Sequence, residues 1–139
     1  MSRDFVYDME VMNAKSGSRD IVADMSPETL KAMLNHRVNF LQEELDELKT
    51  AIANDDPEEI VDAFIDMSVV AISTLDDFHI DIYSAWNEVL SANLTKEPGV
   101  NPTRPNPLGL PDMIKPEDWV PPSHDGNWGL FYKMVAKED

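Results

Sequence analysis

Residues 41–70 read LQEELDELKTAIANDDPEEIVDAFIDMSVV, and this stretch decides the fold. Apolar side chains recur every three or four residues on both sides of a short polar break, NDDPEE, at residues 54–59. Within the break, Asp56 can cap a helix, and Pro57 suits the first helical position. The pattern predicts two helices joined by a short turn, and helices joined in this way pack as an antiparallel hairpin.

The helical spacing continues beyond this stretch in both directions. Ser26, Pro27 and Glu28 form another helix-start signal, so the first helix of the hairpin is expected to begin at Pro27. The expected helices cover residues 4–14, 27–53, 57–77 and 79–96. KSGSRD, at residues 15–20, is typical of a loop, and no strong strand pattern is present. The sequence therefore predicts an all-α fold.

The length of 139 residues fits one domain spanning residues 1–139. We expect its helical core over residues 27–96 and an irregular proline-rich tail over residues 97–139. Eight of the ten prolines lie between Pro98 and Pro122, and the tail ends in a short apolar element, NWGLFYKMVAK.

The charge balance narrows the classes of partner. Asp and Glu number 27 against 11 Lys and Arg, which gives a formal net charge of -16. Such a chain repels nucleic acid and anionic membranes, so neither is expected as a partner. The absence of cysteine excludes disulfides and thiolate metal sites. No signal-peptide pattern or membrane-span pattern is present, and we expect a soluble, cytoplasmic protein.

Several acids lie on helix faces that also carry apolar side chains. At about 100° per residue, Glu44 and Glu47 border the apolar stripe of the first long helix. Glu59, Asp62 and Asp66 share the main polar strip of the second helix, which is apolar nearly all round. The hairpin should bring the two sets of acids face to face.

Carboxylates in such surroundings are costly unless cations compensate them. No Lys or Arg occurs between Lys49 and Lys96. Hard divalent cations such as Mg²⁺ prefer carboxylate oxygens, and helical bundles build metal sites from acids three residues apart on facing helices. The pattern thus favours a metal site. The alternative is an ordinary solvated acidic surface, with Glu59 serving only as a capping residue.

The acids also match a known signature. EELDE at residues 43–47, followed by EIVD at residues 59–62, resembles the E-E-x-x-E … E-x-x-D motif of all-α nucleotide pyrophosphohydrolases of the MazG type. DAFIDMSVVA resembles the second core helix of that family, with Asp66 as a further acid. SANLTK, at residues 91–96, is similar to a segment that ends the next helix. KPEDWVPPSHDG, at residues 115–126, is similar to the tail of short, phage-encoded members.

The resemblance implies hydrolysis of a nucleoside triphosphate to the monophosphate and pyrophosphate. It implies Mg²⁺ as cofactor, two or three ions per site and replaceable by Mn²⁺, and a homo-oligomer, dimer or tetramer, around a four-helix-bundle core. The metal ligands it implies are Glu44, Glu47, Glu59, Asp62 and Asp66. Glu43 and Glu44 would be the catalytic residues that orient or activate a water.

The resemblance further implies that Asn93 and Lys96 bind the nucleotide. Arg37, about two turns before Glu44, is a further candidate for a phosphate contact, with a surface ion pair as the alternative. Trp86 and Trp119 are candidates for stacking on a base, but they can equally be packing anchors.

Three functions remain open on the sequence. The first is hydrolysis of a deoxynucleoside triphosphate, with purines favoured. The second is phosphoribosyl-ATP pyrophosphohydrolase activity, which the same acids could support. The third is non-enzymatic: an acidic helical interaction module whose carboxylates face solvent.

Overall fold

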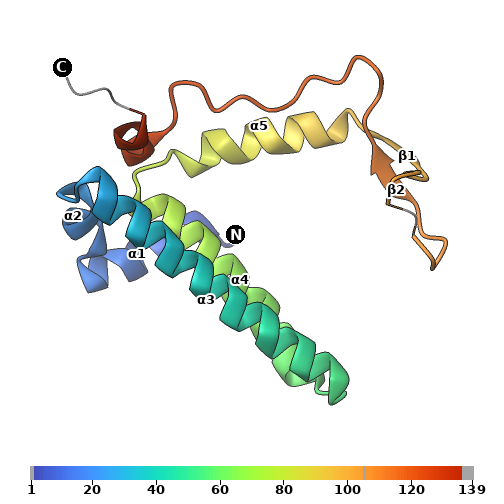
Figure 1. Cartoon of the computed structure of the whole chain (residues 1–139), viewed down its shortest axis with the longest axis horizontal. Helices are drawn as coiled ribbons and strands as arrows, with labels where there is room; N and C mark the ends of the chain where they lie inside the picture. Colours follow the sequence, from blue (N-terminus) through green and yellow to red (C-terminus); the bar gives the residue numbers. More distant parts are fainter. Residues whose placement is uncertain (1, 105, 136–139) are drawn as a thin grey trace. The chain divides into compact units, whose positions relative to one another are not determined.

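Most of the backbone is helical in the computed structural model, which describes residues 2–104 and 106–135 (Figure 1). This agrees with the predicted all-α class. The chain divides into two units, Met1–Ile82 with Trp128–Asp139 and Tyr83–Asn127. The helices of the described chain include none that is long and apolar enough to cross a membrane.

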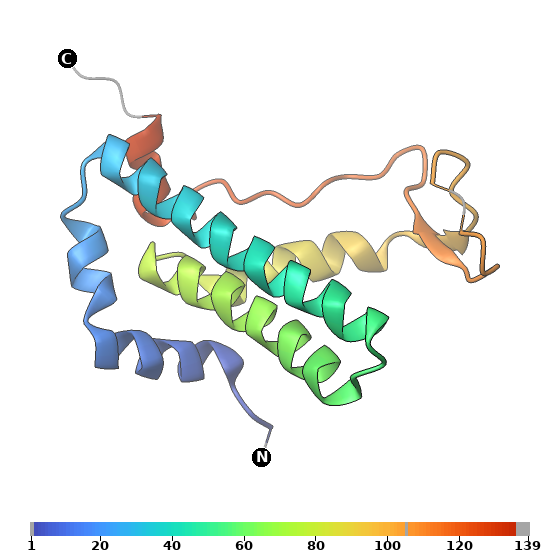
Figure 2. The ribbon, with the colours of Figure 1, turned by 60° about the horizontal axis from the view of Figure 1, so that its bottom comes forward.

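The first unit is built on the predicted hairpin of α3 (Pro27–Ala53) and α4 (Pro57–Asp77). The two helices lie side by side in both ribbon views (Figures 1 and 2). Each begins at its predicted cap: the Ser26 side chain accepts a hydrogen bond from the Thr29 N–H, and Asp56 accepts one from the Glu59 N–H. These local bonds confirm the predicted starts of both helices.

Two shorter helices precede the hairpin: α1 (Phe5–Ser16), which packs along α4, and α2 (Ser18–Ala23). The prediction of a loop at residues 15–20 was wrong, because these residues belong to the two helices except for Gly17. Only Gly17 separates the helices, at a left-handed φ of 72°, and its N–H donates to the Asn13 carbonyl at 2.9 Å. A glycine in this conformation can end one helix and turn the chain into the next within one residue.

The core of the first unit lies at the end of the hairpin away from the turn. Val22, Leu30 and Phe78 are fully buried there. The short 3₁₀ helix η1 (Gly129–Met134) closes this core. Its Leu130 N–H donates to the Phe78 carbonyl at 2.8 Å, and the Phe131 ring stacks on Phe78 with centroids 5.0 Å apart.

Two buried aspartates near the end of α4 connect the N-terminal helices to the hairpin. Asp76 accepts hydrogen bonds from Asn13 at 2.8 Å and from Arg19 at 2.7 Å. Asp77, which is fully buried, pairs with Arg37 of α3 at 3.2 Å. Buried carboxylates need such partners, so this network fixes where α1 and α2 sit on α4.

The second unit contains most of α5 (Ile82–Leu94) and the proline-rich segment. Two short strands, β1 (Glu97–Gly99) and β2 (Asp112–Ile114), pair antiparallel, with Glu97 opposite Ile114. The sequence shows no strong strand pattern in this segment. Each strand has only three residues, and β1 includes Pro98, so neither strand is long enough to show an alternating pattern.

After β2 the chain runs back beside α5 (Figure 1). The Trp119 indole N–H donates to the Ala92 carbonyl at 2.9 Å, and the Ser123 N–H donates to Glu88 at 3.3 Å. These bonds give the proline-rich segment a defined path within its unit.

Candidate metal and active site

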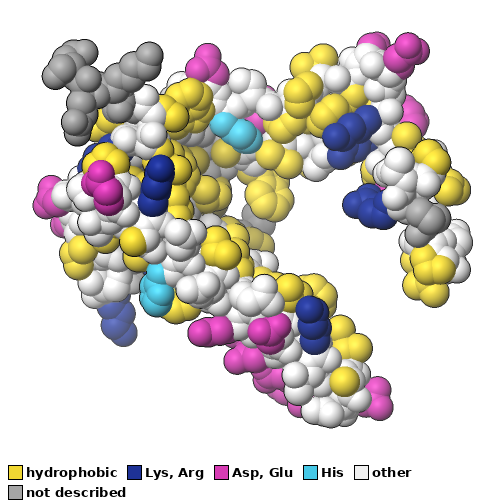
Figure 3. Space-filling view, viewed as in Figure 1, with side chains coloured by type: hydrophobic (Ala, Val, Ile, Leu, Met, Phe, Trp, Pro, Cys, Tyr) yellow, Lys and Arg dark blue, Asp and Glu magenta, His cyan; other side chains and the backbone are white. Residues whose placement is uncertain are grey.

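The two sets of acids occupy neighbouring helices close to the hairpin turn. Glu44 and Glu47 lie one turn apart on α3, and Glu59, Asp62 and Asp66 follow one another along α4. Because the turn is short and the helices are antiparallel, the end of α3 faces the start of α4. Figure 3 shows acidic side chains gathered along one edge of this part of the hairpin.

The electrostatics show that these acids form one cluster. Burial raises the pKa of Glu44, and the negative charges of Glu47 and Asp66 raise it further. Burial likewise raises the pKa of Glu59, followed by repulsion from Asp62 and Glu47. Acids on one helix therefore feel those on the other. We call these five residues the acidic cluster.

The same holds for Asp66, whose pKa is raised by burial and then by Asp62 and Glu47. Glu43 differs from the cluster. Its side chain is exposed, and its charge is not among those acting on Glu44 or Asp66. The five predicted metal ligands thus lie on adjacent helices within electrostatic reach of one another, with Glu43 beside them.

The acidic cluster has no cationic partner within the described part of the chain. The ion pairs found there join other acids to arginines. One carboxylate oxygen of Glu44, Oε2, is buried without a hydrogen-bond partner. A buried carboxylate oxygen in this state is costly, and a hard cation would satisfy it. The chemistry of the donors therefore fits Mg²⁺.

The side chains are not yet arranged as ligands. No three Asp, Glu or His side chains in residues 2–104 and 106–135 stand close enough together to hold a metal ion. Ligation would therefore require the carboxylates of the cluster to rotate toward one another. Long Glu side chains on exposed helix faces can make such rotations readily.

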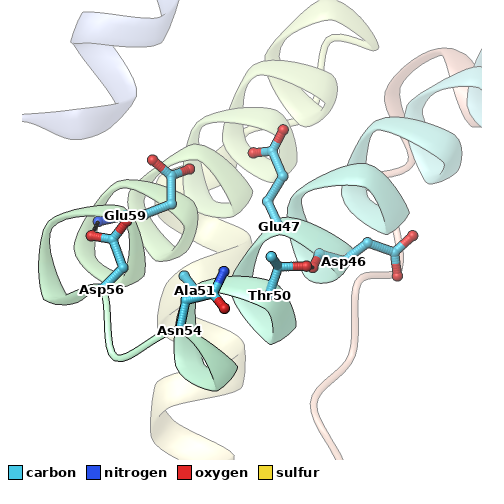
Figure 4. A pocket seen from close by; sticks show the side chains of 7 residues that line it. All are labelled: Asp46, Glu47, Thr50, Ala51, Asn54, Asp56 and Glu59. Carbon is cyan, nitrogen blue, oxygen red and sulfur yellow. Dashed lines mark hydrogen bonds between the residues drawn. The ribbon is translucent and has the colours of Figure 1, made fainter.

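An open hollow of about 410 Å³ adjoins the acidic cluster at the hairpin turn. Figure 4 shows Glu47 and Glu59 projecting on the same side, whereas Asp46 points away. The residues that line it are Asp46, Glu47, Thr50, Ala51, Asn54, Asp56 and Glu59. Thr50 and Asn54 are not among the site residues predicted from the sequence. The available signal was their helical spacing of three and seven residues from Glu47.

The three residues proposed to contact the nucleotide lie in different surroundings. Arg37 is in an ion pair with Asp77, so the ion-pair alternative describes its position, although the pair is buried rather than at the surface. Its Nε is buried without a hydrogen-bond partner among residues 2–104 and 106–135. Asn93 and Lys96 belong to the second unit, where Asn93 is exposed near the end of α5 and Lys96 lies over the Trp119 ring.

Comparison with known proteins places the chain in a family. Residues 19–93, more than half of the chain, match the phosphoribosyl-ATP pyrophosphohydrolase family. The match contains the whole acidic cluster and Arg37, and it ends at Asn93. A search of curated proteins finds no match. Pyrophosphohydrolases cleave phosphoric anhydrides of nucleotides, a reaction that suits clustered carboxylates on adjacent helices. The chain belongs to the phosphoribosyl-ATP pyrophosphohydrolase family.

Proposed function

We propose that this protein hydrolyses a nucleoside triphosphate, a deoxynucleotide with purines favoured, to the monophosphate and pyrophosphate. The observation that carries the proposal is the acidic cluster: five carboxylates on two adjacent helices, without a cationic partner in the described chain. The family supports the reaction class. The resemblance to short members of the MazG type supports the substrate.

The cofactor we propose is Mg²⁺, with Mn²⁺ able to replace it and with two or three ions per site. Glu44, Glu47, Glu59, Asp62 and Asp66 would hold the ions. When bound, the ions neutralise phosphate charge and lower the pKa of a bound water. They would also remove the repulsion between an acidic protein and an acidic substrate.

Glu44 is the proposed general base, with Glu43 as a second candidate. Its Oε2 is buried without a hydrogen-bond partner among the described residues, so this oxygen is available to accept a proton. In the proposed step the water oxygen bonds to the α-phosphorus of the nucleotide, and the water proton passes to the Glu44 carboxylate. The bond from phosphorus to the bridging oxygen then breaks, and pyrophosphate leaves.

A second candidate is phosphoribosyl-ATP pyrophosphohydrolase activity, and the family description favours it. The bond broken is of the same kind, so the acidic cluster serves both reactions equally. The two candidates differ only in the nucleoside portion of the substrate. The matched segment ends at residue 93, whereas the resemblance to short members of the MazG type continues to about Pro122.

We also propose that the protein works as a homo-oligomer, a dimer or tetramer around a four-helix-bundle core. Large apolar side chains of α4 are exposed in the single chain: Val61 by 64%, Phe64 by 55% and Ile65 by 58%. Apolar surface of this kind is typically covered by a partner. Molar mass measured by light scattering tests this, and a monomer at micromolar concentration would contradict it.

A substrate panel tests the proposed activity. Purified protein with Mg²⁺ is incubated with each common dNTP and NTP and with phosphoribosyl-ATP, and released pyrophosphate is measured. We expect the wild type to release pyrophosphate from a deoxynucleotide and Asp62→Asn to release none. The control variant Asp20→Asn, which changes an exposed acid of α2, should stay active. Release from phosphoribosyl-ATP alone would establish the second candidate. No release from any nucleotide would favour the non-enzymatic acidic module.

A further inference from the structure

Two lysines meet at one end of the short β-hairpin in the second unit. Lys96 directly precedes β1 and Lys115 directly follows β2. Since Glu97 pairs with Ile114, the register makes Lys96 and Lys115 the next facing positions. Like charges that face each other across an antiparallel pair destabilise it. The arrangement therefore costs free energy unless something compensates the two charges.

One tryptophan ring brings the two ammonium groups together. Lys96 Nζ lies 5.2 Å and Lys115 Nζ 4.7 Å from the centroid of the Trp119 ring. The indole N–H donates to the Ala92 carbonyl at 2.9 Å, and the Trp119 N–H donates to the Pro116 carbonyl at 3.0 Å. These bonds fix the ring, so it holds both lysine stems in place.

No acid in the described chain forms an ion pair with either lysine, although the protein is strongly acidic. The two strands carry two acids, Glu97 and Asp112, and Asp112 is paired with Arg104. Arg104 is also the main reason that the Asp112 pKa is lowered. Lys96 also contributes to lowering the Asp112 pKa, but neither Lys96 nor Lys115 forms an ion pair within the described chain.

We propose that Lys96 and Lys115, supported by Trp119, form a binding site for the phosphates of a di- or triphosphate. Two ammonium groups held at one tryptophan ring suit a small, highly charged anion better than a single carboxylate. Lys115 and Trp119 are not assigned a phosphate-binding role by the family resemblance. All three residues lie within the second unit. The choice of a polyphosphate as the ligand rests on the proposed function. The bound phosphates belong either to the nucleotide substrate or to the released pyrophosphate.

Calorimetric titration tests the site without hydrolysis. Pyrophosphate is titrated in EDTA, so that no metal bridges it to the acidic cluster. Lys115→Gln should weaken binding about tenfold, as expected for a lost charged contact, and Lys96→Gln should do the same. Lys115→Arg keeps the charge and should keep most of the affinity. The matched control is Lys31→Gln, which removes an exposed lysine of α3 and should bind like the wild type.

The proposal fails if the wild type does not bind pyrophosphate, or if Lys115→Gln binds it as tightly as Lys31→Gln does. A non-hydrolysable triphosphate serves as the second ligand. Weaker binding of both ligands by Lys115→Gln assigns the site to the substrate phosphates, and weaker binding of pyrophosphate alone assigns it to the product. Because binding is measured directly, a protein that hydrolyses no nucleotide in the substrate panel still gives a decisive result.

Discussion

Replacing Glu44 by glutamine should change stability in opposite directions with and without metal. Glu44 is repelled by Glu47, Asp62 and Asp66. A like-charged pair on an exposed helix surface costs about 0.3 kcal/mol, so removing three pairs should stabilise the metal-free protein by about 1 kcal/mol. At an unfolding entropy of about 2.1 cal/mol/K per residue, this corresponds to a Tm increase of about 3 °C.

With Mg²⁺ the wild type should have the higher Tm of the two proteins. Mg²⁺ at 100 times the wild-type Kd contributes about 2.7 kcal/mol, which raises the wild-type Tm by about 9 °C. Loss of one charged ligand weakens the affinity about tenfold or more, so the Glu44→Gln Tm should rise by about 5 °C or less.

Differential scanning fluorimetry in EDTA and in a Mg²⁺ series measures both shifts. Asp20→Asn controls for the change in net charge. If Glu44→Gln lowers the metal-free Tm, or responds to Mg²⁺ as the wild type does, the proposed role of the cluster is refuted.

Three further predictions concern pH and the fold. Because the Glu59 and Asp66 pKa values are raised in the folded chain, their contribution to stability is greatest below about pH 4 and is lost as pH rises through the folded pKa values. The metal-free Tm should therefore be higher at pH 5 than at pH 7.5, and a Tm that rises with pH over this range would be contrary to the argument. Gly129→Ala should lower the free energy of unfolding by about 2–3 kcal/mol in urea titrations, since φ is 48° and a Cβ would overlap the Phe78 carbonyl oxygen. A loss below about 1 kcal/mol would show that η1 tolerates displacement. Asp77→Asn should cost about 3 kcal/mol in the same assay because it leaves the Arg37 charge buried and unpaired; an unchanged midpoint would show that the pair is not needed.

The hairpin could be predicted because its signals are local. Ser26 and Asp56 bond to N–H groups three residues away, and prolines at the first helical positions fix the starts. The helix faces on which the acids lie could be predicted for a similar reason, since helical periodicity alone sets them. These parts of the fold depend on neighbours in the sequence.

The buried aspartates could not be predicted in this way. Asp76 and Asp77 look like solvated acids at a helix end. The partners of Asp76, Asn13 and Arg19, lie about 60 residues earlier in the chain, and Arg37, the partner of Asp77, lies 40 residues earlier. Only tertiary packing brings these groups together. The strand pair depends equally on a distant contact, since its two strands are three residues long and twelve residues apart.

The proposed cleavage by the acidic cluster is tested most directly by identifying the products. The preferred nucleotide from the panel is incubated with Mg²⁺ and the wild type or Asp62→Asn, and the products are separated by anion-exchange chromatography. We expect equimolar monophosphate and pyrophosphate from the wild type, and neither product from Asp62→Asn or in EDTA. A diphosphate with orthophosphate, or an unchanged rate for Asp62→Asn, would contradict it.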